Sequence, residues 1–308
     1  MRSLEAMKNR IRSTDKLLSV VKTMKSLAAV NIRQFEQAAA SAADYGETIK
    51  MGLQAALGHR DGLRLAARPV ARPARQESLG TVVVGSDTGM CGSLNDQVAS
   101  FLLMSIKNYL ELDPSRRPIL AVGEKVAAIL KDEGLPVERT FRVPGSVVGI
   151  TGVVEEILLD LDAWRRERRL DRVLLFYNQQ ESGLNFRPRM FKLLPEDREW
   201  LETLSRKKWP GSSLPTYTMD REPLFAALVR QHIFISVFRA LAYSLASENA
   251  SRLAAMQRAE KNIEEKLGVL NNEFHQQRQS LITEELLDII SGFEALKSER
   301  LSGGQQLF

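Results

Sequence analysis

Two long proline-free stretches at opposite ends of this 308-residue chain constrain its fold more than any other feature. In residues 3–57, apolar side chains recur at steps of three and four, the spacing of one stripe on a helix. Residues 224–296 also lack proline, and their distal half follows a coiled-coil rhythm with one irregular step. At about 1.5 Å per residue these helices would extend roughly 80 and 110 Å, so much of each must project beyond a compact domain. The two stripes are Leu4, Met7, Ile11, Leu18, Val21, Met24, Ala28, Ile32, Phe35 and Ala39, and then Ile263, Leu267, Leu270, Phe274, Leu281, Ile289, Phe293 and Leu296.

These apolar stripes predict that the two helices pack against each other. Covering about eight large side chains on each helix, at ~1.5–3 kcal/mol apiece, gives tens of kcal/mol gross. Because both helices join the same central region, the simplest pairing is antiparallel.

The central region predicts a small, largely parallel α/β domain inserted between the two terminal helices, which pair as an antiparallel coiled coil. Short runs rich in Val, Ile and Leu alternate with helical periodicity. The expected strands are residues 79–85, 118–123 and 171–177, with an edge strand at 190–195, and the expected helices are 94–112, 124–133 and 153–168. We expect a coiled-coil helix over 1–57, an exposed linker over 58–78, the α/β domain over 79–217, the second coiled-coil helix over 218–298 and a tail over 299–308.

Composition removes several classes of protein. Apolar residues at 44% and charged residues at 26% are typical of a soluble globular chain. The single cysteine, Cys91, cannot form an internal disulfide, and three separated histidines offer no zinc cluster, so we expect no metal. No signal sequence is apparent, and no stretch approaches about 18 consecutive apolar residues.

The glycine-rich loop at 85–95 is the obvious place for a phosphate site, and its spacing argues against one. Its glycines stand at 85, 89 and 92 with no lysine after them, which fits neither a dinucleotide fingerprint nor a P-loop. A tight strand-to-helix turn is the simpler interpretation. Cys91 near a helix start could be a nucleophile, but a buried structural role is favoured because no histidine is close in sequence. We therefore expect no catalytic site and no cofactor on this chain.

The charge distribution leaves two functional classes open. The net charge is +5, and residues 1–36 carry eight Lys or Arg against three acidic residues. Such a helix face is either merely solvated or meets an acidic partner. The alternative function is a basic coiled-coil scaffold or nucleic-acid-binding protein, although aromatic residues are only 6% and no nucleic-acid-binding motif appears.

Three segments, in order, resemble the gamma subunit of F-type ATP synthases, the rotating central shaft. The opening helix is similar over 3–30, including Lys22-Thr23-Met24-Lys25. The loop SDTGMCGSLN at 86–95 resembles the family's SDRGLCGGLN. The closing helix is similar at Met256, Ala259 and Asn262 and again over 278–292. The likeness spans nearly the whole chain.

Departures from the family pattern indicate a divergent branch, such as an alternate, sodium-type ATPase. Thr88 stands in place of the usual arginine and Ser93 in place of a glycine, and residues 294–308 extend past the usual end. These differences leave the coupling ion, proton or sodium, and the contacts of the tip open.

The resemblance implies a non-catalytic subunit that couples ion flow through a membrane c-ring to the catalytic beta sites by rotation. Three alpha and three beta subunits would surround the coiled coil, with the epsilon subunit and the c-ring at the globular end and no nucleic acid. Carried over residue by residue, the beta-subunit contacts would be Lys22, Met24, Lys25, Arg278, Gln279 and Thr283. For Met24 the alternative is a place in the helix seam, and for the others simple solvation.

Tyr217 and Met219 lie in the connection before the last long helix and are the candidates for a foot that faces the c-ring. An ordinary exposed turn explains them equally well. The resemblance places the chain peripherally on the cytoplasmic face of a bacterial inner membrane, and it leaves open whether synthesis or hydrolysis dominates.

Overall fold

The structure is a computed structural model that describes residues 2–57, 78–168, 170, 172–182, 185–194, 198–209, 213 and 215–303. The expected linker at 58–78 therefore lies, except for Ser78, outside the described residues. The chain divides into two compact units. Residues 26–255 form the sheet-containing unit, and residues 1–25 with 256–308 form the two-helix unit. Helices α1 (Arg2–Leu57) and α7 (Arg221–Gly303) contribute to both units.

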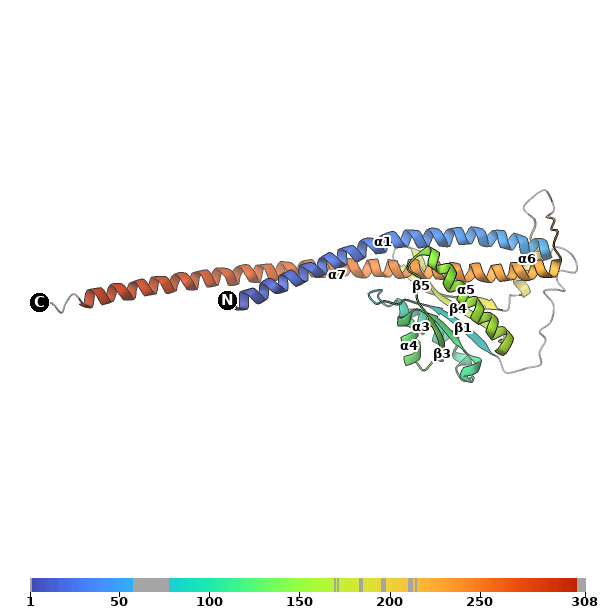
Figure 1. The fold of residues 1–308 in the computed structure, drawn as a ribbon, viewed down its shortest axis with the longest axis horizontal. Coiled ribbons are helices and arrows are strands. Elements are labelled where there is room, and N and C mark those ends of the chain that lie inside the picture. The colour runs from blue at the N-terminus through green and yellow to red at the C-terminus, as the bar shows by residue number, and fades with distance from the viewer. Residues whose placement is uncertain are drawn as a thin grey trace. The chain divides into compact units, whose positions relative to one another are not determined.

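The sheet-containing unit is built on five strands in the order β3-β2-β1-β4-β5 (Figure 1). The strands β1 (Leu79–Val84), β2 (Ile119–Val122), β3 (Val137–Phe141) and β4 (Arg172–Ser182) are parallel to their neighbours. The edge strand β5 (Asn185–Leu194) pairs antiparallel with β4. This confirms the largely parallel α/β sheet and the edge strand, which is longer than expected.

Helices cover both faces of the sheet because successive strand residues point to opposite sides. Val82 and Val84 of β1 pack in one core with α5 (Val147–Ala163). Leu79 and Val83 pack in another core with α3 (Leu94–Ser105) and α4 (Glu124–Asp132). The central part of α7 joins the α5 side. Helices α3 (Leu94–Ser105), α4 (Glu124–Asp132) and α6 (Arg198–Arg206) complete the unit, with short 3-10 turns at Lys107–Tyr109 and Pro114–Arg116 and a π turn at Trp164–Arg168.

Helix α7 carries one strongly apolar window, and part of it lies in the core. By length and composition alone one window of this helix is apolar enough to cross a bilayer, which the sequence reading did not expect. Core helices of soluble proteins pass the same test, and Val237, Leu241 and Leu245 of α7 are buried beside Phe35 and Ala39 of α1. Only 28% of this window is buried, so the core accounts for part of its apolar composition.

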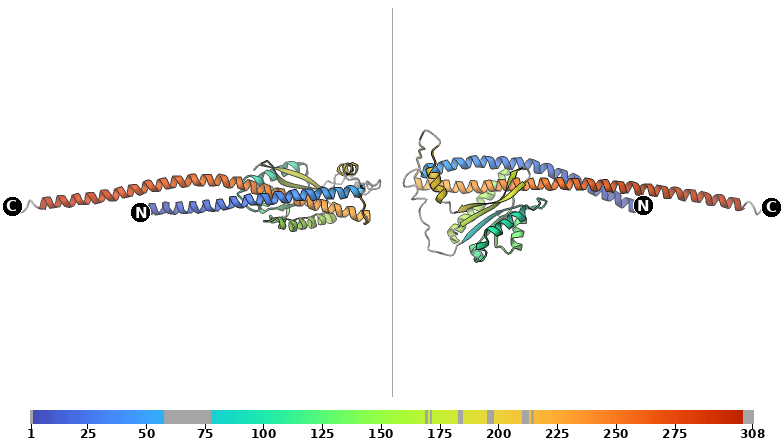
Figure 2. Two further views of the ribbon diagram at one scale, coloured as in Figure 1. Left: turned by 90° about the horizontal axis from the view of Figure 1, so that it is seen from above. Right: turned by 180° about the vertical axis from the view of Figure 1, so that it is seen from behind.

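Within each unit α1 and α7 run antiparallel (Figures 1 and 2). In the two-helix unit Lys22 lies beside Glu260 and Glu264, and in the sheet-containing unit Asn31 contacts Asn249. Residue numbers increase along α1 as those of their partners on α7 decrease, as they must in an antiparallel pair. Every residue of the predicted α1 stripe is buried or half-buried, which confirms the seam.

The α7 stripe is only partly covered. Ile263, Leu267, Leu270, Phe274 and Leu281 are buried or half-buried. In contrast, Ile289 and Phe293 are each 72% exposed, so the expectation that α1 covers them is wrong. Leu4 and Glu5 share a cavity with Leu281 and Ile282, which places the beginning of α1 near residue 281 of α7. The described part of α1 therefore does not extend beside Ile289 and Phe293. Leu296 lies outside the residues whose side chains are described.

Element boundaries also differ from the sequence-based expectations. Strand β3 and helix α6 were not predicted, and α3 ends at Ser105 before the 3-10 turn. Helix α5 begins at Val147, where the Ser146 hydroxyl accepts a hydrogen bond from the Gly149 amide. Helix α7 begins at Arg221 rather than at residue 218, with Pro223 in its first turn, and it continues to Gly303, past the expected end at 298.

Candidate functional site

The predicted contact residues on α1 are engaged with α7. Lys25 Nζ lies 2.5 Å from Glu260 Oε2, and Lys22 Nζ lies 3.1 Å from Glu264 and 3.9 Å from Glu260. Met24 between them is half-buried, as a seam residue should be. In the two-helix unit these lysines therefore have acidic partners on the opposite helix.

The predicted contact residues on α7 are all exposed. Arg278, Gln279 and Thr283 face solvent, and the Thr283 hydroxyl donates a hydrogen bond to the Gln279 carbonyl at 2.9 Å. Arg278 lines a cavity of about 630 Å³ together with residues from the first turns of α1. The other lining residues are Leu4, Glu5, Lys8, Asn9, Arg12, Leu281, Ile282 and Glu285.

The structure does not bring the two predicted sets together. About 27 Å of helix separates Glu260 from Arg278 at ~1.5 Å per residue, so Lys22 and Lys25 belong to a different level of the helix pair. Instead, Arg278 shares its cavity with Lys8 and Arg12. Sequence reasoning missed these two cations, although the antiparallel register would have placed the start of α1 beside residue 278.

From the level of the first turn of α1 onward, α7 carries an exposed apolar surface, which we call the α7 tip (residues 282–293). Exposed apolar patches of this kind on a folded chain mark places where another molecule packs. Its large exposed apolar side chains are Ile282, Leu286, Leu287, Ile289, Ile290 and Phe293.

The loop after β1 is a tight structural turn. A Cβ at Gly85 would lie 2.5 Å from Val126 Cβ and 2.6 Å from Asn95 Oδ1, so the strand end is packed too closely for a side chain. The Ser86 amide donates to Asn95 Oδ1 at 2.9 Å, and Asn95 Nδ2 donates to Ser86 Oγ at 2.8 Å. Cys91 is 2% exposed, which supports its structural interpretation.

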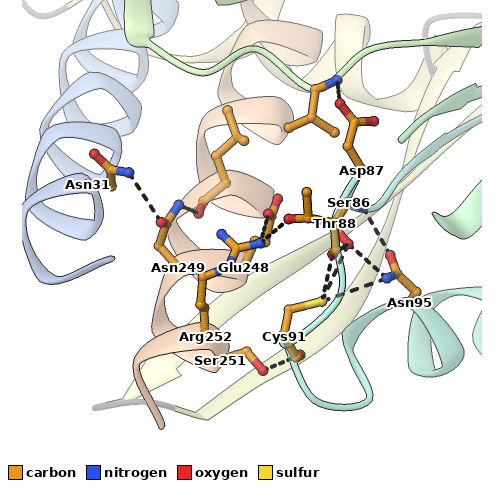
Figure 3. Close-up of polar contacts among 12 residues, drawn as sticks. Asn31, Ser86, Asp87, Thr88, Cys91, Asn95, Glu248, Asn249, Ser251 and Arg252 are labelled. Atoms are coloured by element: carbon orange, nitrogen blue, oxygen red, sulfur yellow. Dashed lines mark hydrogen bonds and ion pairs between the residues drawn. The ribbon is translucent and has the colours of Figure 1, made fainter. Parts of the chain in front are cut away.

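The same loop is fastened to α7 by polar contacts (Figure 3). Arg252 Nη2 donates to Thr88 Oγ1 at 2.8 Å and to Glu248 Oε1 at 2.6 Å. The Ser251 hydroxyl donates to the Cys91 carbonyl. Burial raises the pKa of Glu248, and the Arg252 charge opposes that rise. These contacts join the α/β sheet to the long helix within one unit.

Comparison with known proteins gives the family. Residues 3–296 match the family model described as ATP synthase. An ATP synthase gamma chain from Anaeromyxobacter sp. (strain Fw109-5) is 30% identical over 310 residues, covering 96% of this chain and all of the relative. The chain belongs to the ATP synthase gamma-chain family. One from Buchnera aphidicola is 27% identical, with 97% and 100% covered.

Solved structures with the same fold come from ATP synthases. A chain of the Euglena gracilis mitochondrial OSCP/F1/c-ring structure has a TM-score of 0.61 at 19% identity, covering 97% of this gamma-family chain and 96% of that chain. A chain of the Tetrahymena thermophila central stalk and c-ring structure has a TM-score of 0.55 at 21% identity, with 78% and 99% covered. At these identities the likeness concerns the fold.

Two further predicted residues lie outside these clusters. Tyr217 and Met219 of this gamma-family chain are exposed in the connection that precedes α7. Among the described residues, no group of three or more His, Cys, Asp or Glu side chains is placed to hold a metal ion.

Proposed function

We propose that this chain is the central rotor shaft of an F-type ATP synthase and carries no catalytic site of its own. The observation that carries the proposal is the α7 tip, an apolar helix end whose large side chains are exposed within the part of the chain that the structure describes. Family membership over residues 3–296 supports the same role. The alternative of a nucleic-acid-binding scaffold is not favoured by any relative reported above.

The shaft would be surrounded by three alpha and three beta subunits. Arg278, Lys8 and Arg12 line one cavity and offer three cations to acidic loops of the beta subunits, with Gln279 and Thr283 beside them. Lys22 and Lys25 would act at a second level, where a beta carboxylate has to compete with Glu260 and Glu264.

Rotation would act through differences in contact. Inverting the open-to-closed ratio of a catalytic site from 1:99 to 99:1 requires about 5.5 kcal/mol of differential interaction. Hydrogen bonds to charged groups contribute about 1.5–3 kcal/mol each, so a few of them suffice. Because α1 and α7 have different surfaces, each of the three surrounding catalytic sites would contact a different side of the shaft. Turning the shaft would then change the open and closed populations of each site in sequence.

A shaft must also be fixed to the domain that turns it. The contacts of Arg252 with Thr88 and of Ser251 with Cys91 fasten α7 to the loop after β1 inside the sheet-containing unit. Val237, Leu241 and Leu245 bury the same helix against the sheet. This combination supports transmission of torque from the α/β domain to α7.

At the globular end we assign the epsilon subunit and the membrane c-ring as partners, with Tyr217 and Met219 as foot residues. The subunit would be peripheral, on the cytoplasmic face of a bacterial inner membrane, since the relatives named above include bacterial gamma chains. The coupled ion would be a proton, or sodium in the alternate branch.

The test is a double variant, Arg278→Ala with Gln279→Ala, in the assembled complex. Both side chains are exposed, so the isolated chain should keep its fold while ATPase turnover of the complex falls. Arg165→Ala with Arg166→Ala removes two exposed cations of the sheet-containing unit and serves as the control. Unchanged turnover in the Arg278→Ala, Gln279→Ala variant would show that these two residues do not contribute to coupling with the beta subunits.

A further inference from the structure

The sheet-containing unit holds a cavity that the proposed rotor role does not use. Its volume is about 420 Å³, within the range of small-molecule sites in proteins. The edge strand β5, helix α6 and parts of α1 and α7 enclose it. The lining residues are Lys50, Met190, Phe191, Lys192, Leu193, Trp200, His232 and Arg239.

The lining is strongly cationic. Lys50, Lys192 and Arg239 all contribute to it, and no carboxylate does. Lys50 is partly satisfied because its Nζ donates to Glu47 Oε1 at 2.6 Å. Within the part of the chain that the structure describes, no acidic side chain pairs with Lys192 or Arg239. Glu47 is a counter-charge to Lys50 and lies close enough to Arg239 for their charges to interact, so the excess positive charge at the cavity comes mainly from Lys192 and partly from Arg239. This excess favours an anionic occupant.

The lining also offers flat apolar surfaces. Trp200 and His232 stack with ring centroids 4.9 Å apart, and Phe191 lies on the strand side. His232 Nδ1 is buried and has no hydrogen-bond partner among the described residues. Because this nitrogen is buried, it is not part of the surface that a ligand would contact. Aromatic walls beside cations suit a flat ring that bears an anionic group.

We propose that this cavity binds a small phosphate ester of a flat heterocycle, a molecule of mononucleotide size. The phosphate would lie against Lys192 and Arg239, and the ring would contact Trp200 and Phe191. The site is separate from the loop at 85–95. The proposal goes beyond the rotor role and does not depend on it.

The first experiment measures binding of adenosine monophosphate to the full chain by isothermal titration calorimetry at low salt, with adenosine and inorganic phosphate as separate probes. We expect saturable binding at one site with a Kd on the order of 1 mM or tighter. Each partial probe should bind at least about tenfold more weakly, since it engages only the ring surfaces or only the cations. Absence of saturable binding, or phosphate binding as tightly as the nucleotide, overturns the proposal.

The second experiment locates the site. Lys192→Gln with Arg239→Gln should weaken nucleotide binding at least about tenfold, the loss expected for one or two charge-assisted contacts. Arg165→Gln with Arg166→Gln makes the same change in net charge elsewhere in this unit and should leave the Kd unchanged. An equal loss in both variants shows diffuse charge attraction and overturns the proposal. If the double variant does not fold because Arg239 is needed for stability, Lys192→Gln alone provides the same test, since it changes an exposed side chain.

Discussion

Lys25 of α1 and Glu260 of α7 form an ion pair with Nζ and Oε2 2.5 Å apart, although 235 residues separate them in the sequence. Glu260 is only 16% exposed, so the pair is partly shielded from water and fixes the register of the two helices. Lys22 adds contacts to Glu260 and Glu264. The basic face of α1 is thus partly neutralised inside the chain.

The pair should show measurable coupling in a double-mutant cycle of Lys25→Ala and Glu260→Ala. We expect about 0.5–1 kcal/mol in the free energy of unfolding, read by circular dichroism during urea unfolding. The matched control is Lys261 with Glu265, an exposed pair at 4.0 Å on α7 itself, where coupling should be near zero. Equal coupling in the two pairs would contradict a special role for Lys25 and Glu260.

Gly85→Ala should destabilise the sheet-containing unit by about 3 kcal/mol, because the added methyl meets Val126 and the Asn95 oxygen. Gly89→Ala in the same loop meets nothing within 4 Å and should change stability by less than about 0.5 kcal/mol. Tryptophan fluorescence during urea unfolding measures both, since all three tryptophans lie in this unit. A similar loss of stability in the two variants would show that close packing around Gly85 is not the cause.

His232 should make stability depend on pH. Burial, followed by the charges of Lys50 and Arg239, lowers its pKa from 6.5 to about 4. Between these values the unfolded chain binds the proton and the folded chain does not, so stability rises as pH increases from about 4 to 6.5 and is then constant. At most roughly 3 kcal/mol is involved.

His232→Gln removes this dependence and should flatten the urea midpoint over the same pH range. His275→Gln changes an exposed histidine of the same helix and should leave the slope as it is. A slope that persists in His232→Gln would assign the pH dependence to other groups.

Truncation after Gly292 should reduce ATPase turnover of the assembled complex by less than about tenfold, or ~1.4 kcal/mol in the barrier. The truncation removes Phe293 and leaves five of the six exposed apolar residues of the α7 tip, so guidance of the shaft stays distributed. Assembly is measured by co-purification with alpha and beta subunits. Complete loss of assembly would contradict distributed guidance.

The sequence predicted the long helices well because their signal is repeated over many turns. Leu4 through Ala39 follow one period and all lie in the seam. The antiparallel pairing followed from the connection of both helices to one domain. Strand β3 was missed because its sequence contains no apolar run. Of its residues 137–141 only Phe141 is buried. The register is specified by pairs such as Lys25 with Glu260, which no local pattern announces.

The candidate site was predictable only where family likeness named residues. Arg278, Gln279 and Thr283 are exposed and available. Lys8 and Arg12 share the cavity of Arg278 through the register of the two helices, which local spacing does not provide. The ends of the α7 stripe, Ile289 and Phe293, follow the helical period as well as the covered residues do. They are exposed because the described part of α1 does not extend beside them.

Observation of rotation tests the central claim most directly. Because Cys91 is 2% exposed, a cysteine introduced at Met104, whose side chain is 71% exposed on α3, would be labelled selectively. A probe attached there, in complexes immobilised through their beta subunits, should turn in one direction on addition of ATP and pause at three angles per turn. ATP hydrolysis with the probe stationary relative to the beta subunits would contradict the proposal that this chain is the shaft.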